Sequence, residues 1–181
     1  MKNNFNRGSW HGRALLALVA VLALTIAGTA SAQDGKLEFK GAIGVIPVTG
    51  VAANGTVNLN VVRGVNPGSP WRIAALNAVV TSDGHIRVDG RGLLLASGNG
   101  IGTNAGQTVH ATLFCGPAAS ASAFNSTGVA LAANGDFTID SFLDATLPSS
   151  CENPVLLIRN AGVGVWFAAG IPKLDDGDDK N

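Results

Sequence analysis

The chain has 181 residues, of which 46% are hydrophobic and 13% charged, and its formal net charge is zero. This composition is too apolar for an intrinsically disordered protein. It also lacks the excess of basic residues that a nucleic-acid-binding surface requires, so we expect no nucleic acid among the partners.

The first 32 residues have the pattern of a secretory signal peptide. Basic residues among the first 13 positions precede an apolar run over 14–28, and Ala30-Ser31-Ala32 forms a small-x-small cleavage site. The run is too short for a comfortable transmembrane helix. We therefore expect cleavage near Ala32 and a secreted or periplasmic protein with no transmembrane segment in the mature chain. Loss of three basic residues with this segment leaves nine basic and twelve acidic groups, a net charge of about −3.

The remaining chain predicts short β-strands separated by Gly, Asn, Asp and Pro. Apolar or alternating segments predict strands at 37–48, 56–65, 71–81, 85–95, 107–115, 123–132, 136–143, 155–160 and 165–171. Eight or nine strands at this spacing indicate a single-domain antiparallel β-sandwich, or a flattened barrel, with hairpin and Greek-key connections. We place this domain at 33–173 and predict a flexible acidic tail at 174–181.

Three similar turns predict hairpins, at Asn54-Gly55, Asp83-Gly84 and Asn134-Gly135. A three-residue loop that ends in a left-handed Gly places apolar residues opposite each other in all three cases, which a two-residue loop does not. It pairs Val51 with Val57, Val80 with Ile86, Ala78 with Val88, Leu131 with Phe137 and Val129 with Ile139. We therefore predict a type I turn with a G1 bulge in each hairpin.

The second hairpin has one clearly apolar face. Its predicted inner residues are Leu76, Ala78, Val80, Ile86, Val88, Gly90 and Gly92, with Arg87, Asp89 and Arg91 on the solvated face. Glycines within a strand permit a close approach by another group. The segments 155–159 and 163–171 are more continuously apolar, which predicts strands buried on both faces. Trp71 and Trp166 lie in apolar strands, and we expect them to pack in the core.

Candidate binding residues lie in and beside a polar, Gly-rich stretch at 97–106. The stretch precedes a strand and not a helix, so it lacks the context of a phosphate-binding loop. It favours either a long connection between strands or a recognition loop with Asn99, Thr103 and Asn104 as its hydrogen-bonding groups. His110 alternates out of the core side of the following strand, which favours a surface or groove position.

Cys115 and Cys151 are the only two cysteines of the chain. In an oxidising compartment an even pair favours a disulfide, with Cα atoms within about 7 Å. A reactive thiol or a metal-binding pair is the alternative. The histidines show no metal-ligand spacing, and we expect neither a metal nor a cofactor.

The sequence favours a non-catalytic binding or surface-interaction module, with a glycan or protein at the cell surface as its partner. No G-x-S-x-G motif is present. Two alternatives remain open. One is a secreted hydrolase that uses surface carboxylates or His110, and the other is a self-associating envelope or matrix protein.

Overall fold

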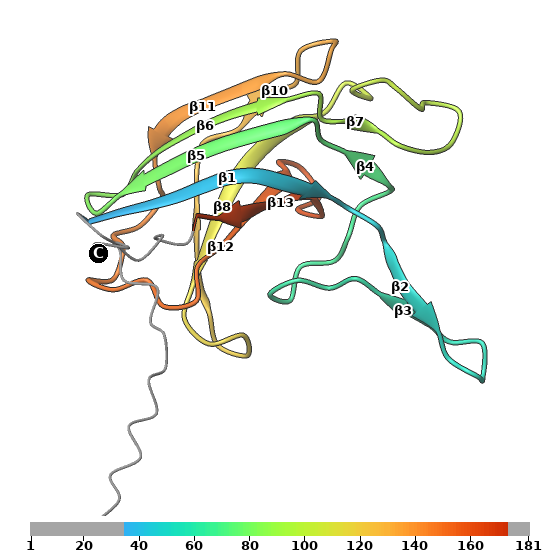
Figure 1. Ribbon diagram of the computed structural model, residues 1–181, viewed down its shortest axis with the longest axis horizontal. Helices are drawn as coiled ribbons and strands as arrows, with labels where there is room; N and C mark the ends of the chain where they lie inside the picture. The colour runs from blue at the N-terminus through green and yellow to red at the C-terminus, as the bar shows by residue number, and fades with distance from the viewer. Residues whose placement is uncertain (1–34, 174–181) are drawn as a thin grey trace, which may run out of the picture.

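The computed structural model describes residues 35–173. The predicted signal peptide at 1–32 and the predicted acidic tail at 174–181 lie outside the described residues. All thirteen elements between residues 35 and 173 are β-strands (Figure 1). They are β1 (Lys36–Gly44), β2 (Val48–Val51), β3 (Val57–Leu59), β4 (Trp71–Arg72), β5 (Ala75–Thr81), β6 (His85–Arg91), β7 (Leu94–Leu95), β8 (Thr108–Cys115), β9 (Ser122–Asn125), β10 (Val129–Ala130), β11 (Phe137–Phe142), β12 (Val155–Asn160) and β13 (Trp166–Pro172).

Nine of these strands form one antiparallel sheet, and two strand pairs stand apart from it. The sheet has the order β10-β8-β12-β13-β1-β5-β6-β11, and β9 also pairs with β8. The N–H of Ala132, after β10, donates to the carbonyl of Asp136, before β11. Strands β10 and β11 stand at opposite ends of the order, yet one turn joins them. The sheet therefore curls so that its two ends approach each other (Figure 1). The prediction of an all-β antiparallel domain of eight or nine strands is confirmed.

Several predicted strands are interrupted in the structure. The segment 71–81 divides into β4 and β5, and 85–95 divides into β6 and β7. Gly92, which lies between β6 and β7, has a positive φ of 63° that departs from strand conformation. Strands β4 and β7 then pair with each other outside the main sheet. The segment 123–132 likewise divides into β9 and β10, and 56–65 yields only the short β3.

The three Gly turns have the same geometry. The N–H groups of Gly55, Gly84 and Gly135 donate to the carbonyl three residues earlier at 2.8–2.9 Å, and the glycines have φ values of 80–85°. This is the predicted type I turn with a left-handed Gly. The predicted pairs of the first two hairpins are confirmed, namely Val51 with Val57, Val80 with Ile86 and Ala78 with Val88.

The third hairpin departs from the predicted register. Its turn forms, but Val129 pairs with Val109 of β8, and no ladder pair joins β10 to β11 in residues 35–173. The predicted pairs of Leu131 with Phe137 and Val129 with Ile139 are therefore wrong. The segment before the turn is instead held along β8, where Ala130 pairs with Thr108 and the N–H of Leu131 donates to the carbonyl of Gln107 at 2.9 Å, so its ladder is with β8 and not with β11.

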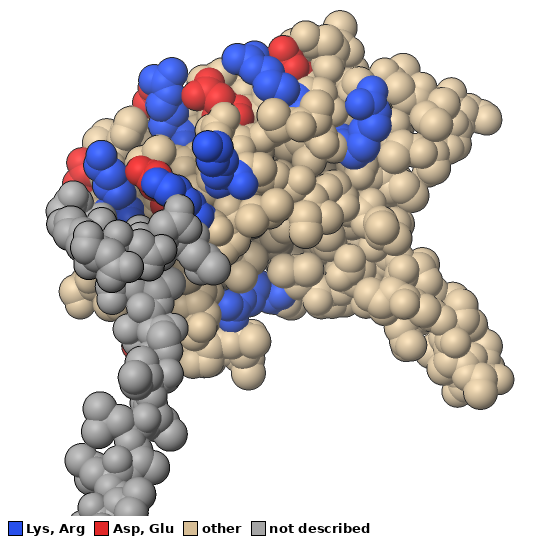
Figure 2. Space-filling model, in the orientation of Figure 1, with Lys and Arg blue, Asp and Glu red and all other residues tan. Residues whose placement is uncertain are grey.

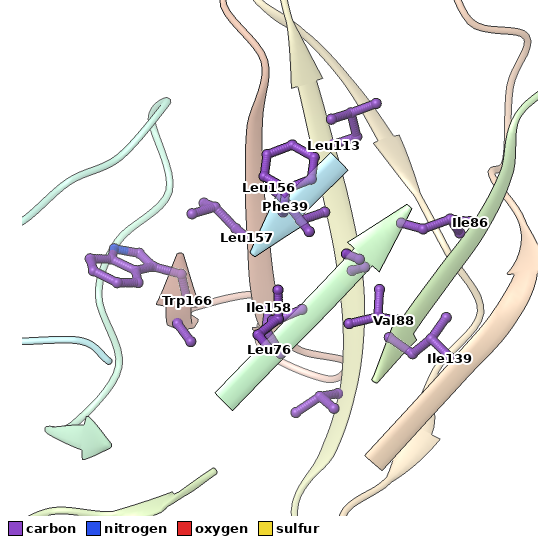
Figure 3. Packing of buried hydrophobic residues seen from close by; sticks show 14 of the residues in the cluster. Phe39, Leu76, Ile86, Val88, Leu113, Ile139, Leu156, Leu157, Ile158 and Trp166 are labelled. Atoms are coloured by element: carbon purple, nitrogen blue, oxygen red, sulfur yellow. The ribbon is translucent and has the colours of Figure 1, made fainter. Parts of the chain in front are cut away.

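The core lies on the inner side of the curl (Figure 3). Every predicted inner apolar side chain of the β5–β6 hairpin is buried, and β12 is buried on both faces as expected. The segment 163–171 meets the same expectation only over 166–168, because Val163 and Ile171 are exposed. Trp71 and Trp166 are also buried, and Trp71 stacks on Phe167 with ring centroids 4.2 Å apart. The fully buried aliphatic side chains include Leu76, Val80, Ile86, Val88, Leu93, Leu113, Ile139, Leu156, Leu157 and Ile158.

Gly90 provides the close approach that a strand glycine permits. It pairs with Phe137 of β11, and a Cβ atom at this position would lie 2.1 Å from the Phe137 ring. The ring is buried and occupies the space that any side chain at residue 90 would need. Packing therefore requires glycine at residue 90. Backbone conformation does not, because the φ of Gly90 lies outside the left-handed region.

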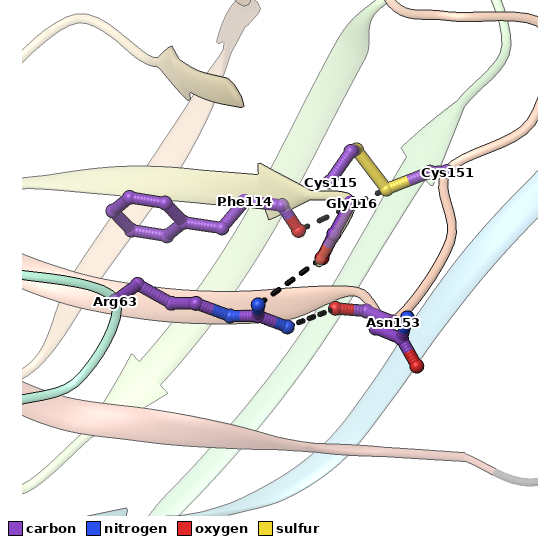
Figure 4. Close-up of a disulfide and its surroundings, with 6 residues drawn as sticks. All are labelled: Arg63, Phe114, Cys115, Gly116, Cys151 and Asn153. Atoms are coloured by element: carbon purple, nitrogen blue, oxygen red, sulfur yellow. Dashed lines mark hydrogen bonds between the residues drawn. A yellow bond between two sulfur atoms is a disulfide. The ribbon is translucent and has the colours of Figure 1, made fainter. Parts of the chain in front are cut away.

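Cys115 and Cys151 form the predicted disulfide, with Cα atoms 4.8 Å apart. Arg63 reinforces the same region. Its guanidinium donates to the carbonyl of Gly116 at 3.1 Å and to the carbonyl of Asn153 at 2.7 Å (Figure 4). Each acceptor follows one of the two cysteines closely in sequence, so Arg63 ties the chain after β3 to both segments that the disulfide joins.

Candidate functional site

The 97–106 loop uses most of its predicted recognition groups to hold itself in place. Asn104 donates through Nδ2 to the carbonyls of Leu131 and Ala132 at 2.9 and 3.0 Å. Its Oδ1 accepts from the N–H of Gly106, and the Thr103 hydroxyl donates to the Gly100 carbonyl at 2.7 Å. Asn99 is exposed at the tip. Thr103 and Asn104 thus have a structural role, and ligand binding by this loop stays a prediction.

His110 lies apart from that loop's tip, on the outer face of β8. It is half-buried and stands directly opposite Arg159 of β12 in the ladder. Burial lowers the pKa of the His110 imidazole, the positive charge of Arg159 lowers it further, and the Asp144 carboxylate opposes the shift. The neutral imidazole is therefore favoured at neutral pH.

A polar network crosses the outer face beside His110. Thr112 is fully buried, donates through Oγ1 to Asn125 Oδ1 at 2.8 Å, and accepts from Arg159 Nη1 at 3.3 Å. Asn125 donates to both carboxylate oxygens of Asp144, through its backbone N–H at 2.8 Å and through Nδ2 at 2.9 Å. These bonds lower the pKa of Asp144. The network links β8, β9, β12 and the chain after β11.

The hydrogen bonds of this network hold neighbouring strands together. The Thr112 hydroxyl already donates to one partner and accepts from another, and Arg159 also donates through Nε to the Gly164 carbonyl at 2.7 Å. Burial lowers the pKa of Arg159. The sequence pointed to His110 beside this network and to Asp144 as a surface carboxylate, but not to Thr112 or Arg159. Arg159, at the end of a continuous apolar strand, was a visible hint that a charged group would need buried partners.

The second described histidine belongs to an exposed group of paired charges. His85 Nε2 lies 2.7 Å from Asp140 Oδ1, and Arg87 lies 3.4–3.5 Å from the carboxylates of Asp89 and Asp140. Figure 2 shows basic and acidic side chains interspersed over this part of the body. Such exposed pairs contribute little to stability. The hydrolase alternative stays a prediction.

A pocket of about 230 Å³ lies beside the disulfide. It is formed where β1 begins, where β5 ends and along 147–151, so it brings aliphatic and hydroxyl-bearing side chains together. Its lining residues are Gly35, Leu37, Val80, Thr81, Ser82, Leu147, Pro148, Ser149, Ser150 and Cys151. None of the predicted binding residues lines it.

The most prominent surface feature is the β2–β3 hairpin, which we call the arm and define as residues 46–61. It projects from the curled sheet (Figure 1), and its visible surface carries no charged side chain (Figure 2). Six large aliphatic side chains of the arm are exposed, namely Ile46, Val48, Val51, Val57, Leu59 and Val61. The sequence predicted the hairpin at Asn54-Gly55 but did not indicate that its apolar side chains would stay exposed.

Asn60 anchors the base of the arm. The backbone N–H of Asn60 donates to the Pro47 carbonyl at 2.8 Å, and its Nδ2 donates to the Ile46 carbonyl at 3.0 Å. The buried indole of Trp166 donates to the Asn60 carbonyl at 2.9 Å. Asn60 therefore joins the two sides of the arm to each other and to β13.

Together these features define a disulfide-bonded, all-β protein with an apolar arm. No protein-family model, curated protein or solved structure matches the chain. Across 35–173, no group of three or more His, Cys, Asp or Glu side chains could hold a metal ion. In the same range, no helix has the length and apolar character needed to cross a membrane.

The depressed pKa of His110 predicts a pH-dependent stability. Between the ordinary histidine value of 6.5 and the lower folded value, the unfolded chain binds more protons than the folded chain. The free energy of unfolding should therefore fall as the pH drops below about 6.5. Urea unfolding of the wild type and His110→Gln at pH 7.5, 6.0 and 5.0 measures this, and the variant should lose less stability over that range. Equal losses in both proteins would contradict the assignment to His110.

Proposed function

We propose that this protein is an exported, non-catalytic interaction module whose apolar arm binds a protein surface. The observation that carries the proposal is the exposure of six aliphatic side chains on one projecting hairpin. Exposed apolar patches of this kind mark interaction sites in soluble proteins. An isolated two-stranded hairpin is also only marginally stable in water, so an arm of this form benefits from a partner that covers it.

Export is supported by the sequence pattern at 1–32 and by the disulfide. Disulfides persist mainly in oxidising compartments, such as a periplasm or the extracellular medium. A protein partner is favoured over a glycan because the arm presents aliphatic groups, whereas sugars are bound by hydrogen-bonding and aromatic side chains. Residues 41–62 contain no aromatic side chain.

Photo-cross-linking tests the arm as the binding surface. A photoreactive amino acid replaces Leu59 on the arm in one protein, and Val163, an exposed valine in the turn between β12 and β13, in a control protein. Under illumination in the native secretory compartment, we expect covalent adducts at residue 59 that are missing at residue 163. Equal adduct formation at both positions, or none at residue 59, would overturn the proposed function.

A further inference from the structure

The arm has one apolar face and one polar face. Val48 pairs with Leu59 and Val51 pairs with Val57 across the two strands. Residues directly opposite each other in an antiparallel pair share a face, so all four aliphatic side chains point the same way. Asn58 and Gly50 form the pair between them and therefore lie on the other face.

The apolar face is open in the described structure. Val51 is 64% exposed, Val57 and Leu59 are each 50% exposed, and Val48 is 41% exposed. Together with the exposed Ile46 and Val61 at the base of the arm, these residues expose on the order of 500 Å² of surface, near the upper end for the largest patch on a soluble monomer. Two copies would bury on the order of 1,000 Å² between them, which reaches the lower limit for a specific interface.

The chemistry of the arm fits its own copy better than a different protein. Residues 41–62 contain no charged residue, so two arms can approach without electrostatic repulsion. The same stretch has no arginine or aromatic residue, which are the usual anchors of an interface between different proteins. Interfaces of homodimers are more apolar than those of transient complexes between different proteins. A two-fold axis requires only a patch that is complementary to itself.

We propose that the partner of the arm is a second copy of this chain, with the Val48, Val51, Val57 and Leu59 faces of two arms packed against each other about a two-fold axis. This inference rests on the proposed function, since both require the arm to be the binding surface. The hydrogen bonds that attach the arm through Asn60 and Trp166 restrict it before it binds. This reduces the conformational entropy that the arm loses on association, which favours binding. The contact closes on itself, so association stops at the dimer.

Sedimentation equilibrium of the purified, disulfide-bonded protein over a wide concentration range tests the proposal. The wild type should shift reversibly from monomer to dimer as concentration rises. The double substitution Val51→Thr/Val57→Thr keeps the shape and strand preference of a cross-strand pair but makes it polar. It should weaken dimerisation at least tenfold, whereas Val163→Thr, at a 78% exposed valine outside the arm, should leave it unchanged. Thermal unfolding checks that both variants remain folded.

Each outcome separates this inference from the proposed function. A wild type that is monomeric at every concentration, a dimer that survives the arm substitutions, or an open-ended series of larger species would overturn the two-fold arm interface. The adduct formed at residue 59 then decides the broader proposal. Adducts with twice the mass of the chain support self-association, and adducts of other mass leave the arm as a binding surface for a different protein.

Discussion

Replacing both cysteines, in Cys115→Ala/Cys151→Ala, should lower the free energy of unfolding by about 4 kcal/mol in the chain-entropy account of disulfides. The bridge spans 36 residues of sequence, so the unfolded chain gains considerable freedom when it is removed. The folded chain loses a connection between β8 and the segment before β12. Urea unfolding at pH 7.5 measures the difference between the two proteins.

Reductant provides the matched control for this experiment. The wild type should lose a similar amount of stability in excess dithiothreitol, whereas the double variant should be insensitive to it. Arg63 spans the same two segments through the Gly116 and Asn153 carbonyls, so the native arrangement should persist after the bridge is removed (Figure 4). A double variant as stable as the wild type would show that the disulfide does not stabilise the fold.

Substituting Gly90 by alanine should destabilise the protein by about 3 kcal/mol, the upper part of the usual range for overpacking a core. The new Cβ atom would lie 2.1 Å from a carbon of the Phe137 ring, and either the ring or strand β6 must move. The ring is buried and has little space in which to move. Chemical denaturation of Gly90→Ala measures the loss.

Gly50→Ala is the matched control, because Gly50 also lies in a strand, has no positive φ, and has nothing within 4 Å of the position that an added methyl group would take. It should change stability by less than about 1 kcal/mol. Adding Phe137→Leu to Gly90→Ala removes the clashing ring edge, so the double variant should lose less than the sum of the two single losses. Additive losses would show that the ring does not set the requirement for glycine.

The local features of this fold were predictable because they depend on residues close in sequence. Alternating apolar residues identified the strands and the inner face of the β5–β6 hairpin. The side-chain oxygens of Asn54, Asp83 and Asn134 each accept from the backbone N–H two residues on, which explains why the same turn forms three times. Turn chemistry also fixed the register of two hairpins. In the third hairpin the turn formed, but the strand before it pairs with β8 and not with β11, and that pairing joins segments distant in sequence.

The polar network on the outer face shows where local reasoning stops. Thr112, Asn125, Asp144 and Arg159 lie in four separate parts of the sequence, and nothing in their spacing joins them. They meet because β9 and β12 both pair with β8. The order of strands in a sheet depends on backbone pairing between distant segments, and that order placed a half-buried arginine next to a buried hydroxyl.

The order of residues along the chain was enough to predict the all-β class, the three Gly turns, the inner face of the β5–β6 hairpin and the disulfide, because side-chain alternation, turn conformation and cysteine number act locally or by simple count. Only the tertiary structure revealed the strand order, the polar network and the exposure of the arm, because each depends on contacts between segments that are distant in sequence. Val51 and Val57 have the same pattern as the buried valines of β5 and β6. Whether an apolar face is covered depends on which other strands reach it, and in the arm none of the described strands does.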